Sequence, residues 1–265
     1  MSAGTLFSVV TVCRNARAAL EVTAASVLPQ RSPDVEYLIV DGASTDETPA
    51  TLERLSTQGV RVISEPDLGI ADAMNKGVRL ALGTWVSHLH AGDTWLPDTL
   101  AVVRREVERA DAEVMCGWLL KDEDTGETLY RADPGRLDRE MTLNHPAAFV
   151  RRECFERFGG FDPAYPNAMD YEFFLRLKRA GVRIQVIERP LARMAGGGQS
   201  ERSLWRTASE CRAIRRRHGS SAWHSSQVYF LWTVARGLAR RALQRLGLRA
   251  AVAWYRRHLS WPPKG

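Results

Sequence analysis

The sequence is poor in the features that mark stapled, zinc-binding or membrane-spanning proteins. Its four cysteines, Cys13, Cys116, Cys154 and Cys211, lie far apart and form no Cys-x-x-Cys pair, which argues against a disulfide framework or a zinc site. No run of about 20 apolar residues occurs, so a transmembrane helix is not expected. The chain opens without a basic segment followed by an apolar one, so we expect no secretory leader and a cytoplasmic protein.

Charge is distributed unevenly along the 265 residues. The segment from residue 200 onward carries 14 Lys and Arg against two acids, whereas the preceding 199 residues carry 23 bases and 29 acids. A mildly acidic body with a basic tail indicates that the two parts contact different partners. We therefore predict a catalytic domain over residues 1–200 and a basic helical extension over 201–265.

Short β-branched runs alternate with amphipathic segments through the acidic body. This alternation predicts βαβ units, that is, an α/β protein with a mostly parallel sheet and helices on both faces. Ligands of such sheets bind beyond the carboxyl ends of the strands. Strands are expected at 7–12, 36–40, 60–64, 85–89, 114–120, 128–131, 147–150 and 182–187, and helices at 17–28, 48–55, 70–82, 97–110, 152–158 and 170–180.

Acidic residues follow two of these predicted strands. Asp41 ends one strand and opens the turn-rich segment that contains Asp46, and Asp93 lies just past another. Taken singly, an aspartate in such a place is most often part of a turn or a helix cap, because its carboxylate accepts backbone hydrogen bonds. The ordered set of motifs along the chain decides the question.

These motifs resemble those of a known enzyme family. The segments that carry the resemblance are Ser8–Val12, Leu38–Thr48, Ser64–Gly77, Gly83-Thr84-Trp85, Leu89–Asp93 and Asn167–Glu172. In this order they are similar to family 2 glycosyltransferases of the GT-A fold, a Rossmann-like mixed sheet, and to the bacterial branch that builds exopolysaccharide, lipopolysaccharide and glycolipid sugars. The resemblance spans residues 6 to 200.

The resemblance implies a site for a nucleotide-sugar donor linked to UDP, GDP or dTDP. It places Asp41 against a base N–H and Asp72 against base or ribose, with Thr11, Arg14 and Asn75 in the same pocket. An aspartate at the start of a helix is also a common cap, which is the alternative role of Asp72.

The resemblance also implies a divalent metal that neutralises the donor diphosphate. Mg²⁺ or Mn²⁺ takes hard oxygen ligands, typically one or two carboxylates plus the phosphates. The family uses an Asp-x-Asp motif, but the matching stretch here is Ala91-Gly92-Asp93. Asp93 is therefore expected to be the main protein ligand, with water or His90 at other positions.

An inverting transfer needs a base beside the acceptor hydroxyl. Asp170 matches the family's catalytic acid and opens a predicted helix whose backbone amides favour its ionised form; capping that helix is the alternative role. Glu172 is expected to be a first-turn acid. His145 is expected near the metal, diphosphate or acceptor, although a lone histidine has no ligand spacing. The segment Gly196–Ser200 is either a loop over the diphosphate or a linker.

The basic tail reads as helical from Leu204. Arginines recur mostly at intervals of four, while Leu and Trp fill other positions, a pattern typical of helices that lie on an anionic membrane surface. The alternative is an extension packed on the catalytic domain or on a second subunit of a homo-oligomer. Nucleic acid is not an expected partner, because no nucleic-acid motif accompanies the charge.

The resulting expectation is an inverting, metal-dependent hexosyltransferase. It would move a sugar from a nucleotide donor to a lipid-linked saccharide or glycolipid, as a peripheral protein on the inner face of the plasma membrane. The alternative is a catalytically weak nucleotide-sugar-binding or scaffold protein that has lost one metal acid. A nucleotidyltransferase is disfavoured, because no Gly-rich phosphate loop bearing Lys or Arg opens the chain.

Overall fold

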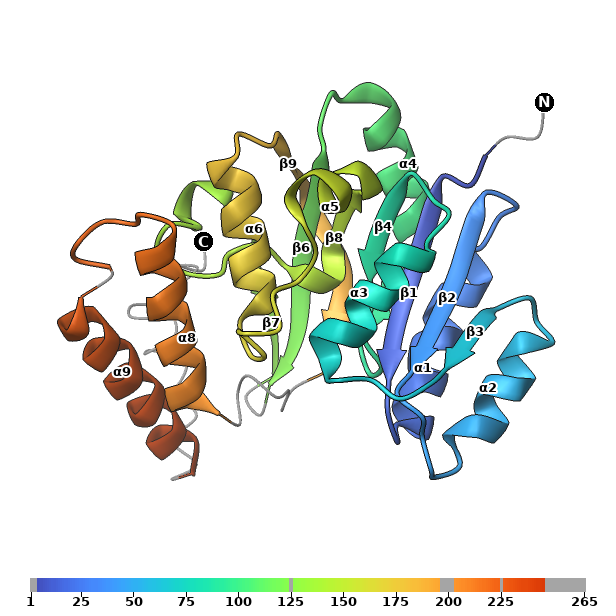
Figure 1. Cartoon of the computed structure of the whole chain (residues 1–265), viewed down its shortest axis with the longest axis horizontal. Coiled ribbons are helices and arrows are strands. Elements are labelled where there is room, and N and C mark those ends of the chain that lie inside the picture. Colours follow the sequence, from blue (N-terminus) through green and yellow to red (C-terminus); the bar gives the residue numbers. More distant parts are fainter. Residues whose placement is uncertain (1–3, 124–125, 196–202, 225, 246–265) are drawn as a thin grey trace.

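One mixed sheet organises the molecule. The structure is a computed structural model that describes residues 4–123, 126–195, 203–224 and 226–245. The strands lie side by side in the order β3-β2-β1-β4-β8-β6-β9-β5, and β7 pairs with β6 outside this path (Figure 1). Their bounds are β1 Phe7–Cys13, β2 Val35–Asp41, β3 Arg61–Ser64, β4 Trp85–His88, β5 Thr94–Trp95, β6 Val114–Glu123, β7 Gly126–Tyr130, β8 Ala148–Arg151 and β9 Ile184–Met194.

The first half of the sheet is parallel and the second half is mixed. β3, β2, β1 and β4 run parallel, and the register pairs Cys13 with Asp41 at their carboxyl ends. β8 is antiparallel to β4 and β6, whereas β9 runs parallel to β6. The carboxyl ends of β1, β2 and β4 therefore meet at one edge, the lower edge in Figure 1. The expectation of a mixed α/β sheet with helices on both faces is confirmed.

Helices cover the sheet on two sides, and the strands alternate between the two cores. Val10 and Val12 of β1 belong to one core, and Phe7 and Val9 of the same strand belong to the other. α3 (Ile70–Leu80), α5 (Arg152–Phe158), α6 (Met169–Arg179) and α8 (Leu204–Arg217) contribute to the first core. α1 (Arg17–Val27), α2 (Thr48–Ser56) and α4 (Thr99–Arg109) contribute to the second. This alternation is what a strand covered on both faces requires.

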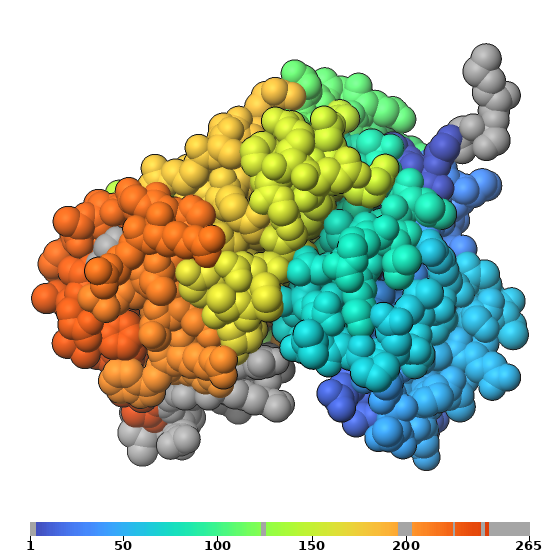
Figure 2. Space-filling view, in the orientation of Figure 1, coloured from blue at the N-terminus to red at the C-terminus, as the bar shows by residue number. Residues whose placement is uncertain are grey.

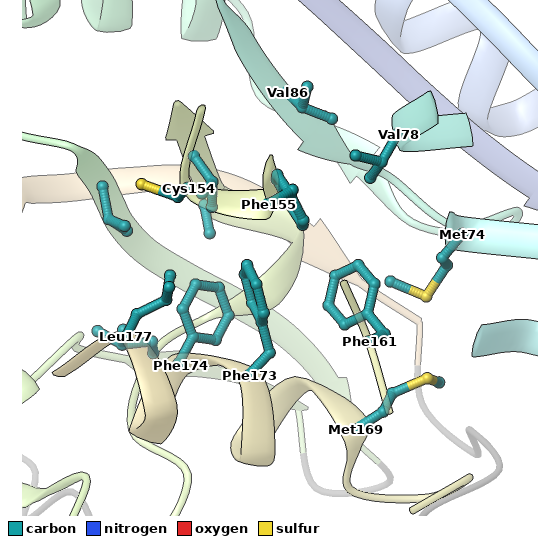
Figure 3. Packing of buried hydrophobic residues seen from close by; sticks show 14 of the residues in the cluster. Met74, Val78, Val86, Cys154, Phe155, Phe161, Met169, Phe173, Phe174 and Leu177 are labelled. Carbon is teal, nitrogen blue, oxygen red and sulfur yellow. The ribbon is translucent and has the colours of Figure 1, made fainter. Parts of the chain in front are cut away.

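Aromatic rings fill the first core between α5 and α6. Phe155 and Phe173 stack with centroids 4.7 Å apart, and Phe161 lies 4.9 Å from Phe173 (Figure 3). Asn75 of α3 closes this region, because its amide donates to the Phe161 carbonyl and accepts from the Phe161 N–H, both at 2.8 Å. The loop before α6 is thereby fixed to α3.

The basic tail begins as part of the body and ends as its outermost helix. Ile214 of α8 is fully buried in the first core. α9 (Gln227–Arg245) packs on α8 at Gly237, where a Cβ atom would lie 2.7 Å from Leu204, and it forms the outer flank in Figure 1. The predicted boundary near residue 200 and the Gly196–Ser200 segment lie outside the described residues.

Two features of the fold differ from the expected elements. β5 has only two residues, too few for periodicity to reveal, and it exists because it pairs with β9. β9 runs to Met194 rather than ending near 187, because β6 and β5 both pair with its second half. Among the residues described, no helix is long and apolar enough to span a bilayer.

We expect Gly77→Ala to destabilise the fold. In a helix interior this change normally stabilises by about 0.5–1 kcal/mol. Here a Cβ atom would lie 2.3 Å from Val10 Cγ1, so overpacking should cost about 1–3 kcal/mol instead. Urea denaturation of the single variant and of Gly77→Ala with Val10→Ala checks this, since the second change should restore part of the loss. A stabilised single variant would contradict the close contact of α3 with β1.

Candidate functional site

The edge where β1, β2 and β4 end carries a fully buried carboxylate. Asp41 is the last residue of β2, and its side chain accepts hydrogen bonds from Ser64 Oγ at 2.7 Å and from Ser44 N at 3.0 Å. The Ser44 hydroxyl donates to it as well. Asp41 therefore holds the turn after β2 and the end of β3 together, as the turn alternative for this residue anticipates.

The accessible groups at this edge surround Gly42. A Cβ atom on Gly42 would lie 2.2 Å from the Asp67 carboxylate and 3.4 Å from Cδ of Arg14. Arg14 is exposed and Asp67 is half-buried. A base N–H entering beside Gly42 would therefore meet Asp67, a residue absent from the predicted set, and Arg14, which belongs to it.

Asp72 lies in the first turn of α3 and binds its own loop. Its carboxylate accepts from Leu68 N at 3.1 Å and lies 3.6 Å from Lys76 Nζ. Lys76 also pairs with Glu65 at 3.0 Å. These contacts shape the loop between β3 and α3. The residue at the helix N-cap is Gly69, and Asp72 binds the amide of the residue before it.

Two residues predicted to contact the nucleotide-sugar donor, Thr11 and Asn75, form hydrogen bonds within the protein. Thr11 is fully buried, and its hydroxyl donates to the Leu89 carbonyl at 2.7 Å and lies 3.2 Å from the Tyr37 hydroxyl. The amide of Asn75 binds the Phe161 backbone through both its oxygen and its nitrogen. These contacts give both side chains an architectural role at the edges of the site.

The segment His90–Asp93 forms a tight turn that is fixed to α1. Gly92 has a φ of 102°, a conformation that favours glycine, and its N–H donates to Thr23 Oγ1 at 2.9 Å. The Thr23 hydroxyl also reaches the carbonyls of His90 at 3.2 Å and Asp93 at 2.8 Å. Thr23 therefore sets the position from which the Asp93 carboxylate projects.

Asp93 is a desolvated carboxylate. Its side chain is 9% exposed, and burial raises its pKa to about 7, although the backbone N–H of Ala195 and the charge of Lys121 oppose the rise. A cation beside the Asp93 carboxylate would stabilise its ionised form, because the cation would offset the cost of burying the anion.

Three imidazole rings gather beside this turn. His145 lies 5.1 Å from His90 and 5.7 Å from His88 between ring centroids. Burial lowers the pKa of His88 to about 3 and of His90 to about 4, and it lowers that of His145 as well. All three rings are therefore neutral at physiological pH. Within the described chain, His90 Nδ1 is buried and lacks a hydrogen-bond partner.

The residues present fit a metal that is shared with a substrate. In the described ranges no three His, Cys, Asp or Glu side chains converge to hold an ion. A dedicated protein cage is therefore not formed by these residues. Mg²⁺ and Mn²⁺ also bind through one or two carboxylates completed by phosphate oxygens and water, and the buried Asp93 carboxylate suits that arrangement.

Asp170 occupies the first turn of α6. Its Oδ1 accepts from Tyr171 N at 2.7 Å, and burial raises its pKa to about 6. Phe174, one turn later on the same side of the helix, packs against His145 with centroids 6.3 Å apart. This face of α6 therefore turns toward the histidines and the Asp93 turn.

The site thus joins segments from both halves of the sheet. The turn after β4 supplies Asp93, the turn before β8 supplies His145, and α6 supplies Asp170. In the space-filling view the teal residues of α3 and the yellow residues before α6 meet on one face of the molecule (Figure 2). A separate hollow of about 470 Å³ between α3 and α5 includes Asn75 but no other predicted site residue.

Some residues of this region escaped the sequence analysis. Asp67 stands in a quoted motif, but it looks like an ordinary turn aspartate. His88 and Lys121 lie within strands and have no spacing that indicates a site. Thr23 lies inside a helix, and only the tertiary fold brings it to the Gly92 turn.

Comparison with known proteins identifies relatives of this chain. The chain is 32% identical over 179 residues to the PGL/p-HBAD biosynthesis glycosyltransferase of Mycobacterium tuberculosis. The aligned residues cover 66% of this chain and 70% of the relative. It is 29% identical over 168 residues to the chondroitin synthase of Escherichia coli. Here the aligned residues cover 59% of this chain and 24% of the relative.

Solved structures share the fold at low identity. The mannosyltransferase PcManGT from Pyrobaculum calidifontis, in complex with GDP-Man and Mn²⁺, has a TM-score of 0.69 at 20% identity and covers 97% of this chain and 83% of that one. S. aureus TarS 1-349 in complex with UDP-GlcNAc has a TM-score of 0.62 at 16% identity, and the match covers 90% of this chain and 73% of that one. Residues 8–169 match glycosyl transferase family 2, and the chain therefore belongs to that family.

Proposed function

We propose that this glycosyltransferase moves a hexose, with inversion, from a nucleotide-diphosphate donor to a hydroxyl of a lipid-linked saccharide or glycolipid. The observation that carries the proposal is the pair of carboxylates formed by Asp93, which is buried in the turn after β4, and Asp170, which is half-buried in the first turn of α6. UDP-GlcNAc and GDP-Man in the structural neighbours, and the glycolipid pathway named for the mycobacterial relative, support the choice of substrates.

Asp170 is the proposed base. With a pKa of about 6, it is ionised at neutral pH and still accepts a proton readily. It would take the proton of the acceptor hydroxyl as the new C1–O bond forms on one face of the sugar. The bond from C1 to the diphosphate breaks on the opposite face, and the nucleoside diphosphate leaves.

Asp93 is the proposed contact to Mg²⁺ or Mn²⁺ on the donor diphosphate. When bound, the metal supplies positive charge to the leaving group. The three neutral imidazoles line the same region without adding charge, and His90 Nδ1 can accept or donate a hydrogen bond to donor or acceptor. Arg14 and Asp67 beside Gly42 are proposed to contact the base or ribose.

The first test combines nucleotide release with donor binding. Incubation with a panel of nucleotide sugars, Mn²⁺ and membrane extract should release one nucleoside diphosphate, and kcat should fall as the pH drops through about 6, because Asp170 becomes protonated. Asp170→Asn should keep donor affinity and lose at least 100-fold in kcat, the usual scale of a removed base.

Full turnover by Asp170→Asn would remove Asp170 as the base. If wild-type protein binds a donor but releases no nucleotide with any acceptor extract, the chain is a nucleotide-sugar-binding or scaffold protein instead.

A second test follows the metal through stability. Mn²⁺ with a nucleoside diphosphate should raise the Tm of wild-type protein more at pH 8 than at pH 6, because Asp93 must lose its proton to bind the ion and its pKa is about 7. Differential scanning fluorimetry of wild type and Asp93→Asn checks this, with the nucleotide alone as control. An equal Tm shift in Asp93→Asn would argue against Asp93 as a ligand.

We also propose that α9 attaches the enzyme to an anionic membrane that contains its acceptor. Six of the nine large apolar side chains exposed in the described chain lie in α8, α9 and their connection, among them Trp205, Trp223 and Trp232. Among the α9 side chains that the structure describes, the exposed ones after Gln227 are apolar and lie along one stripe of the helix: Val228, Leu231, Trp232, Ala235, Leu238, Ala239 and Ala242.

Charge complementarity favours lipid over another occupant for this face. Arg236 lies 4.2 Å from the Trp232 ring centroid, and the sequence adds Arg240, Arg241 and Arg245 to the same helix. A helix with an apolar stripe, tryptophan and flanking arginines matches those that lie in anionic interfaces.

Cosedimentation with phosphatidylglycerol vesicles tests this attachment. The double change Leu231→Ser with Trp232→Ser should weaken vesicle binding about 10- to 100-fold, because the apolar area that enters the interface is lost. Leu82→Ser is the matched control, since Leu82 is 63% exposed outside the C-terminal helices. Unchanged vesicle binding by the double variant would contradict the membrane role. So would a wild-type protein that does not bind vesicles but forms a concentration-dependent dimer, if the double variant abolishes that dimer.

A further inference from the structure

A buried glutamate from the C-terminal extension reaches the catalytic helix. Glu210 of α8 is 9% exposed, and its Oε2 accepts from Asn167 N at 2.8 Å and from Ala168 N at 3.0 Å. Its Oε1 accepts from Asn167 Nδ2 at 3.3 Å. One carboxylate thus binds the two residues directly before α6.

This contact takes the place of a local cap. α6 begins at Met169 after Ala168, whose side chain offers no cap hydrogen bond. The carboxylate of Asp170 is occupied with Tyr171 N. Amides at the start of a helix need acceptors. The N–H of Ala168, the residue before the helix, is shared between the Tyr165 carbonyl at 3.1 Å and Glu210, which lies 42 residues away in sequence. Its negative charge also suits the positive end of the helix.

A second contact, between Glu172 and His218, fixes α8 on the other side of the same turn. Glu172 is 1% exposed, and its carboxylate lies 2.9 Å from His218 Nε2 and 2.8 Å from Arg176 Nη2. Between Glu210 and His218, Ile214 is fully buried. α8 therefore holds the turn that bears Asp170 both before it, at residues 167–168, and after it, at Glu172.

From these contacts we infer that Glu210 is a positioning residue for the transfer reaction. It sets the first turn of α6, and with it the direction of the Asp170 carboxylate. The basic extension is then part of the catalytic centre as well as the part that carries α9. This inference rests on the proposed role of Asp170 as the base.

Two substitutions at one position separate positioning from simple stability. Glu210→Ala removes the carboxylate from both amides and leaves the Ala168 N–H only the Tyr165 carbonyl, at 3.1 Å, whereas Glu210→Gln keeps a carbonyl oxygen that can receive both amides. We expect Glu210→Ala to lower kcat about 10- to 100-fold, the usual cost of a misplaced catalytic group, with donor KM unchanged within about threefold. Glu210→Gln should recover most of kcat.

Titration of Asp170 gives a readout that does not need turnover. In Glu210→Ala, water should reach the first turn of α6, so the pKa of Asp170 should fall, and the acid limb of the kcat profile should move to lower pH. Carbon-detected NMR of the labelled carboxyl measures the pKa directly. Arg217→Ala is the control. It breaks the ion pair between Arg217 of α8 and Asp162, and it should leave kcat and the pKa of Asp170 unchanged.

The outcomes distinguish this inference from the proposed function. If Asp170→Asn is inactive but Glu210→Ala retains full kcat and an unchanged Asp170 pKa, the inference is wrong and the function stands. If Glu210→Ala and Glu210→Gln lose activity equally with the pKa unchanged, Glu210 serves stability alone and the inference is also wrong. If Asp170→Asn is fully active, the proposed base fails, whatever Glu210 does.

Discussion

The parallel register of β1, β2 and β4 is the constraint on which the site depends. Because Cys13 pairs with Asp41 and Val10 with His88, these three strands deliver their last residues to one edge of the sheet. The turn after β4 then has only to be fixed in direction, and Thr23 does this by binding three backbone groups of that turn. A slip in this register would separate the residues that the turns bring together.

Burial then gives the gathered groups their chemistry. Asp93 and Asp170 lie where few donors compensate their charge, so the pKa of each rises, to about 7 and about 6 respectively. Asp41 lies deeper but is satisfied by two serines, which makes it a support of the edge. The same desolvation lowers the pKa of each histidine and keeps the rings neutral. Asp41 thus differs from Asp93 and Asp170, the carboxylates proposed to act on the substrates, in the number of protein donors around it.

Much of this could be predicted from the sequence, and the failures have identifiable causes. Strand and helix alternation predicted the α/β fold, and the sequence also predicted that Asp41 and Asp93 lie at strand ends, where the structure places them. Spacing does not show where a polar side chain finds its partners. Thr11 and Asn75 stay predicted contacts of the nucleotide-sugar donor, and only the structure shows the hydrogen bonds that both make within the protein. Glu210 could not be predicted, because its partners are more than 40 residues away in sequence.

The two helices after the sheet, α8 and α9, connect the proposed base to the surface proposed to bind the membrane. α8 is joined to α6 by Glu210 and His218, and α9 packs on α8 while its apolar stripe faces outward. In the account proposed here, a membrane-bound acceptor and the base that activates it are linked through one rigid pair of helices.

The most direct measurement is a crystal structure of the protein with Mn²⁺ and the nucleoside diphosphate of its donor. The account predicts the base beside Gly42, between Arg14 and Asp67, and the diphosphate with its metal on Asp93, facing Asp170. A nucleotide bound elsewhere, for example in the hollow between α3 and α5, or a metal held without Asp93, would contradict it.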